Sequence, residues 1–151
     1  MTDVLSIGAP DGAIAEAVRA ILGRYGLAIT WVADDAPITG TFFGDREAGL
    51  IGSQLYVRSD TPVHSALHEG CHWICADETR RATVEADIGG DDLEECAVCY
   101  LSVVLADAIP GCGAERLLAD MDAWGYSYRC GSARAWFTTD AADARAWLEA
   151  R

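Results

Sequence analysis

All three histidines of this chain, His64, His68 and His72, lie in one short stretch with a spacing of four residues. On a helix, side chains four positions apart share one face with Cβ atoms about 5–6 Å apart, so two such imidazoles can hold one zinc ion. The segment His68–His72 reads HEGCH and matches the H-E-x-x-H pattern of zinc hydrolases. We therefore expect His68 and His72 to bind Zn²⁺, and Glu69 to be the general base that takes a proton from zinc-bound water.

His64 is not expected to bind the same ion, because in an unbroken helix it lies about 12 Å from His72 along the axis. The pair His64/His68 also has Ser65 where the other pair has Glu69. His64 is instead a candidate for supporting a ligand or for donating a hydrogen bond to a developing oxyanion. Further candidate donors to an oxyanion lie nearer the C-terminus: Tyr126, Tyr128, Arg129 and Arg134.

A catalytic zinc site usually has three protein ligands, so a third must come from elsewhere in the chain. Glu94 and Glu95 stand at the start of a predicted helix over residues 91–106. If Asp92 is the N-cap of that helix, Glu95 falls at the N3 position and can complete a capping box. That arrangement would leave Glu94 for the metal, so we prefer Glu94 and keep Glu95 as the alternative.

The composition limits the class of partner. The chain has 151 residues, the size of one domain, and its 24 acidic and 11 basic residues give a formal charge of −13. This charge argues against nucleic acid and anionic membranes as partners, and it weakly favours cationic peptides. The substrate expected from the zinc motif is a peptide or protein. We recognise no signal segment and no apolar run of about 18 residues, so we expect a cytoplasmic protein whose six cysteines are mostly reduced.

Hydrophobic periodicity and turn residues predict an α+β fold, in which a small antiparallel sheet of about three strands packs on the histidine helix and several further helices. Thr61 is the expected N-cap of the histidine helix, with Pro62 at its first position. The run Leu55–Arg58 is a candidate edge strand that could hold an extended peptide. Predicted strands cover residues 27–32, 38–43 and 50–58, and the other predicted helices cover residues 11–24, 113–124 and the segment after Thr139 or Asp140.

Two segments resemble the ImmA/IrrE-type peptidases, which are small gluzincins. The first is LIGSQLYVRSDTPVHSALHEGCHWI, and the second follows the family form E-x-x-A-x-x-F-A as Glu94-x-x-Ala97-x-x-Tyr100-Leu101. The resemblance covers about residues 40–106 and implies a minimal zincin-like domain with zinc ligands His68, His72 and Glu94, and Glu69 as the base. The chain departs from the family at Val98, where asparagine is usual, and at Tyr100, where phenylalanine is usual. We expect one domain over residues 1–151, with this metal-site core followed by a helical part over residues 107–151.

Together these features predict a zinc metallopeptidase, a hydrolase in which zinc-bound water attacks a peptide carbonyl with the help of Glu69. A non-catalytic binding or regulatory protein of zincin fold is one alternative. The other is a structural zinc protein built on the cysteine pairs Cys71/Cys75 and Cys96/Cys99, although cysteines on apolar helix positions commonly act as small hydrophobic residues.

Overall fold

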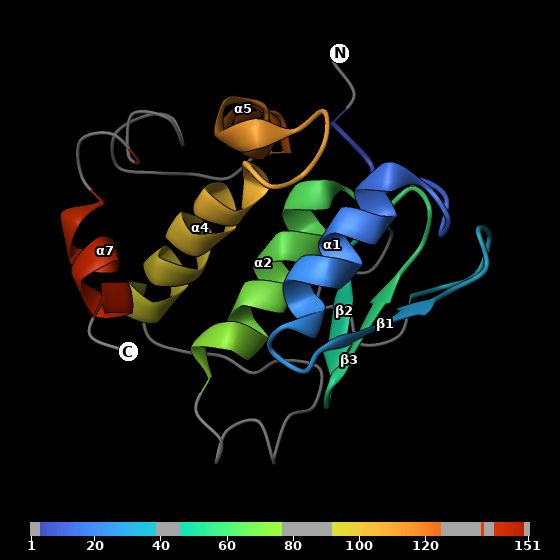
Figure 1. Ribbon diagram of the computed structural model, residues 1–151, viewed down its shortest axis with the longest axis horizontal. Helices are drawn as coiled ribbons and strands as arrows, with labels where there is room; N and C mark the ends of the chain where they lie inside the picture. The colour runs from blue at the N-terminus through green and yellow to red at the C-terminus, as the bar shows by residue number, and fades with distance from the viewer. Residues whose placement is uncertain (1–3, 39–45, 77–91, 125–136, 138–140, 150–151) are drawn as a thin grey trace.

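The computed structural model describes residues 4–38, 46–76, 92–124, 137 and 141–149. These ranges form an α+β fold with five helices and a three-stranded sheet, as the sequence predicts (Figure 1). The helices are α1 (Ala13–Gly23), α2 (Val63–Cys75), α4 (Asp92–Ala106), α5 (Gly113–Trp124) and α7 (Ala142–Glu149). The strands are β1 (Ala28–Trp31), β2 (Gly49–Ile51) and β3 (Gln54–Val57). None of the helices in the described ranges is long and apolar enough to cross a membrane.

The sheet is mixed, and the prediction of a purely antiparallel sheet was wrong. Its strand order is β1-β3-β2, with β1 parallel and β2 antiparallel to β3. The predicted strand over residues 50–58 is in fact a hairpin, because Gly52 has a φ of +57° and reverses the chain together with Ser53. The part of the predicted strand 38–43 beyond Ile38 lies outside the described residues.

Because β3 lies between the other two strands, the run Leu55–Arg58 is not an edge strand. Both sides of β3 are already paired, Leu55 with Ile29 in β1 and with Leu50 in β2. A peptide therefore cannot extend the sheet at β3 by backbone hydrogen bonds. Within the described residues, the outer strands of the sheet are β1 and β2.

The expected N-caps of two helices also differ from the structure. Gly12 rather than Asp11 precedes α1, and Pro62 rather than Thr61 precedes α2. The Thr61 hydroxyl instead accepts a hydrogen bond from the backbone N–H of Arg58 at 2.8 Å. Thr61 thus stabilises the turn between β3 and α2, which fixes the direction in which the histidine helix leaves the sheet.

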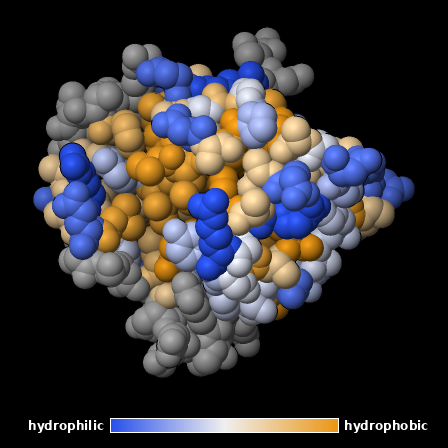
Figure 2. Space-filling view, in the orientation of Figure 1, coloured by the Kyte–Doolittle hydropathy of each residue, from blue (hydrophilic) through white to orange (hydrophobic). Residues whose placement is uncertain are grey.

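Helix α2 lies at the centre of the molecule, with α4 on one side and α1 and the sheet on the other, while α7 lies beyond α4 (Figure 1). One cluster of buried apolar side chains extends from Ile7 to Ala144 and includes residues of every helix in the described ranges. A second, smaller cluster of Cys71, Cys75 and Val98 joins α2 to α4. On the face drawn in Figure 2, apolar side chains also gather over these two helices.

The N-terminal segment secures the start of α2. The N–H of Ile7 donates to the carbonyl of Thr61, and the N–H of Val63 donates to the carbonyl of Leu5, both at 2.8 Å. The N–H of Leu5 in turn donates to the buried carboxylate of Asp120 on α5, also at 2.8 Å. The first turn of α2 is therefore connected through this segment to α5.

Gly70, inside the HEGCH segment, allows α1 to approach α2 closely. A Cβ atom at this position would lie 2.7 Å from Cδ2 and 3.0 Å from Cδ1 of Leu22 on α1. Leu22 is completely buried, so its side chain has little room to move away. The glycine of the motif therefore has a packing role that is separate from metal chemistry.

We expect Gly70→Ala to destabilise the wild-type protein, because overpacking costs about 1–3 kcal/mol and outweighs the gain of up to about 1 kcal/mol in helix propensity. In a Leu22→Ala background the contact is gone, so the same substitution should stabilise by up to about 1 kcal/mol. Urea unfolding of the four proteins of this cycle measures both effects. Equal effects of Gly70→Ala in the two backgrounds would contradict the packing role.

Candidate metal centre

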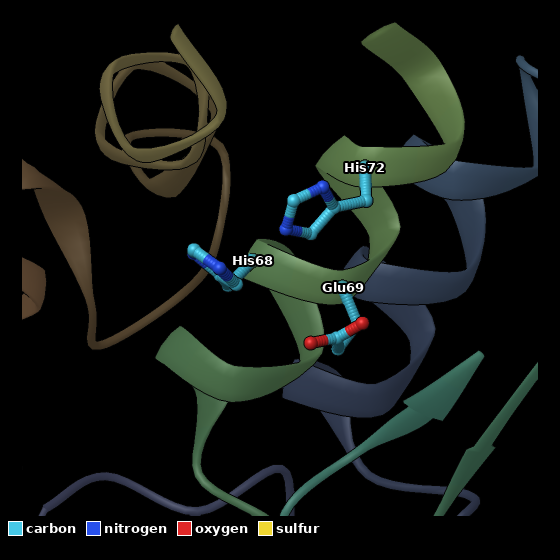
Figure 3. Close-up of side chains that lie close together, drawn as sticks. All are labelled: His68, Glu69 and His72. Carbon is cyan, nitrogen blue, oxygen red and sulfur yellow. The ribbon is translucent and has the colours of Figure 1, made fainter. Parts of the chain in front are cut away.

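Helix α2 presents three of the predicted site residues together. Ligand atoms of His68, Glu69 and His72 all lie within 4.8 Å of one another. The two imidazoles are edge to face, with ring centroids 4.9 Å apart and an interplanar angle of 81°. Figure 3 shows the two rings on the same side of α2, with the Glu69 carboxylate beside them. The helical spacing of the HEGCH segment thus brings together the residues that the sequence predicts.

Helix α4 contributes a carboxylate to the same place. Nε2 of His68 lies 2.8 Å from Oε1 of Glu95, and Nε2 of His72 lies 3.1 Å from Oε2 of the same residue. Each carboxylate oxygen thus contacts one imidazole, and the side chain keeps about half of its surface exposed (49%). Two helices that are separated in sequence by a long connection therefore provide three converging potential ligands.

The structure brings Glu95, and not the preferred Glu94, to the histidine pair. Glu95 lies on the same face of α4 as Cys99, one turn later, and Cys99 also contacts His68. Glu94 is 100° away around the helix and is buried on another face, with only 4% of its surface exposed. The sequence analysis expected Glu95 to complete a capping box, whereas in the structure both of its carboxylate oxygens contact the histidine pair.

The donor set fits zinc in type. Two imidazole nitrogens and one carboxylate are the ligands of many catalytic zinc sites. Bonds of about 2.0–2.1 Å in a tetrahedral arrangement place ligand atoms about 3.3 Å apart. The separations of 2.8 and 3.1 Å between Glu95 and the two histidines are shorter and are hydrogen-bond distances, so the side chains would have to move apart to admit an ion.

Glu95 is ionised at neutral pH. Burial alone raises the pKa of this carboxyl, but hydrogen bonds and charge from His68 and His72 outweigh burial and hold the pKa well below its usual range. An ionised carboxylate has only acceptor oxygens, which is the form that binds a cation. The site therefore has its anionic ligand available without a proton to displace.

His64 is buried one turn before His68, with 2% of its surface exposed. Burial lowers its pKa to about 3, and the positive charges of His68 and Arg46 add to the effect. At neutral pH His64 is therefore a neutral imidazole. It belongs to neither of the two groups of potential ligands among the described residues, and its exclusion from the ion stays a prediction. Its supporting or oxyanion role stays a prediction.

The cysteines do not form the predicted alternative zinc site within the described part of the chain. Cys71 and Cys75 are buried in the apolar cluster with Val98, and burial raises the pKa of the Cys71 thiol. No group of three potential ligands there includes either of them. Cys99 instead joins His68 and Glu95 in a second group, a contact that the sequence analysis missed although Cys99 follows Glu95 by four residues.

The other residues predicted as hydrogen-bond donors to an oxyanion lie outside the described residues: Tyr126, Tyr128, Arg129 and Arg134.

The low pKa of His64 predicts how the free energy of unfolding changes in acid. Between pH 6.5 and about 3, the unfolded chain protonates this imidazole and the folded chain does not, so stability falls as the pH falls, by about 1.4 kcal/mol per unit. Above pH 6.5 the contribution of His64 to the free energy of unfolding does not change with pH. His64→Leu should remove this dependence.

Urea unfolding of wild type and His64→Leu at several pH values, with a chelator present, tests this. The difference between their free energies of unfolding should shift in favour of the variant as the pH falls from 6.5 to 4. A difference that stays constant over this range would show that His64 protonates normally in the folded protein.

Comparisons with known proteins provide no family for this chain: no family model, no curated protein and no solved structure matches it. The geometry of α2 and α4 is therefore the basis for a functional assignment. That geometry combines the motif glutamate and histidines of one helix with a carboxylate from another.

Proposed function

We propose that this protein is a zinc metallopeptidase of zincin-like fold, which holds Zn²⁺ with His68, His72 and Glu95. The observation that carries this proposal is the contact of both Nε2 atoms with the two oxygens of Glu95, at 2.8 and 3.1 Å. A glutamate following the first histidine of such a pair is the arrangement of zinc peptidases. The proposal replaces Glu94 of the family pattern with the neighbouring Glu95.

Zinc in this site would polarise the substrate carbonyl and lower the pKa of a water molecule. The proximity of Glu69 supports its role as the general base, since its carboxylate lies within 4.8 Å of the ligand atoms of His68 and His72. It would accept a proton from the attacking water and deliver it to the leaving amine. The residue as a whole is partly buried.

The charge of the molecule suggests which peptides would reach the site. A formal charge of −13 attracts cationic segments and repels acidic ones, with a strength that decreases as salt increases. Basic peptide or protein segments are therefore the proposed substrate class.

The ligand assignment predicts that the protein binds about one Zn²⁺ per chain and that Glu95→Gln weakens binding more than about 100-fold, beyond the 10–100-fold typical of a lost outer partner. Glu94→Gln is the matched control, one residue away, and should change the affinity of the folded protein less than about threefold. Competition with a chromophoric chelator measures both dissociation constants. Strong loss with Glu94→Gln and none with Glu95→Gln would reverse the assignment.

The role of Glu69 predicts that Glu69→Gln keeps its zinc but loses about 10²–10⁴-fold in peptide cleavage. A synthetic peptide library rich in arginine and lysine, analysed by mass spectrometry, identifies the cleaved bonds and provides the rates. Equal cleavage by the variant would exclude Glu69 as the base. A zinc-loaded wild type that cleaves no member of the library would favour a non-catalytic binding protein.

A further inference from the structure

Cys99 contacts the side of His68 that does not face the candidate metal position. Its Sγ lies 3.8 Å from Nδ1 of His68, while Nε2 of the same ring faces Glu95 at 2.8 Å. Cys99 and Glu95 are one turn apart on α4, so one helix contacts both nitrogens of this imidazole. Cys99 is also buried, with 5% of its surface exposed, which keeps water away from this contact.

The two nitrogens of a metal-binding imidazole have different requirements. When Nε2 of a neutral histidine binds a metal, the ring proton is on Nδ1, and the group that faces Nδ1 must accept a hydrogen bond. In most metal sites this acceptor is a carboxylate, a backbone carbonyl or water, and it fixes the orientation of the ring. In this protein the atom opposite Nδ1 of His68 is a cysteine sulfur, which is a weak acceptor.

We propose that Cys99 is a positioning residue of the metal site, whose sulfur accepts the Nδ1 proton of His68 and holds Nε2 toward His72 and Glu95. This inference rests on the proposed function, because it requires a metal on Nε2. In this arrangement Cys99 is not itself a ligand, because its sulfur contacts Nδ1 and the ion would bind Nε2. Ligand atoms of His68, Glu95 and Cys99 also lie within 4.8 Å of one another, so direct ligation by the sulfur is an outcome that the second experiment tests. A hydrogen bond to sulfur is thus expected to set the zinc affinity of His68.

The first experiment compares Cys99→Ala and Cys99→Ser with wild type by competition for zinc against a chromophoric chelator. We expect Cys99→Ala to weaken zinc binding about 10–100-fold relative to wild type. Cys99→Ser should weaken it much less, because a hydroxyl also accepts a hydrogen bond. A packing role predicts the reverse order, because a serine hydroxyl is costlier than a methyl group in a buried apolar place. Cys112→Ala, which removes a thiol from the segment between α4 and α5, should remain within about twofold of wild type.

The second experiment uses Co²⁺ in place of zinc, since its visible and near-ultraviolet spectrum reports sulfur ligation. We expect no thiolate-to-cobalt charge-transfer band in wild type, and a d–d spectrum that Cys99→Ala perturbs and Cys112→Ala does not. A charge-transfer band that disappears in Cys99→Ala would overturn the proposal by making Cys99 a ligand. Unchanged zinc affinity in Cys99→Ala would overturn it as well, whereas a wild type that binds no zinc would instead overturn the proposed function.

Discussion

Both nitrogen atoms that face the candidate metal position belong to α2, whereas the carboxylate between them belongs to α4. The site therefore depends on how these two helices pack against each other. A rotation of α4 by one residue, about 100°, would replace Glu95 with a different side chain and remove the candidate third ligand. The cluster of Cys71, Cys75 and Val98 fixes the same contact with apolar side chains next to the polar ones. Packing and candidate chemistry thus share one helix interface.

The rest of the fold fixes the position of α2. The hydrogen bond between Arg58 and Thr61 stabilises the turn after β3 and so sets the direction of α2. The N-terminal segment forms backbone hydrogen bonds at the first turn of α2. On its opposite face, Gly70 brings α1 against the helix through Leu22. A metal site needs ligands placed to within about 0.5 Å. Contacts on several sides of α2 favour such precise placement of its two histidines.

Local sequence information was enough for one part of this structure. The HEGCH segment predicts a helix with two histidines and a glutamate in one group, and the structure has this arrangement. Helix α5 matches its predicted range, and α4 differs by one residue at its start. The hairpin between β2 and β3 was missed although Gly52 and Ser53 are typical turn residues, because the apolar residues on both sides were interpreted as one strand.

The sequence alone could not decide which of the two glutamates faces the histidine pair, and the reason is physical. Glu94 and Glu95 are adjacent, and only the rotation of α4 against α2 decides which of them faces the histidines. Local capping rules favoured Glu94, but the contacts of Glu95 with both imidazoles prevail in the folded chain. The neighbour of His68 on its other side, Cys99, depends on the same rotation. The hydrophobic periodicity of a single sequence predicts helices, but it does not predict how two helices distant in sequence are rotated against each other.

The most direct test of this account is an anomalous diffraction map of zinc-loaded crystals, measured on both sides of the zinc absorption edge. The account predicts one peak bonded to Nε2 of His68, Nε2 of His72 and the carboxylate of Glu95, at the distances of about 2.0–2.2 Å that zinc adopts with nitrogen and oxygen. A peak bonded to Glu94, or to the sulfur of Cys99 at about 2.3 Å, would contradict it.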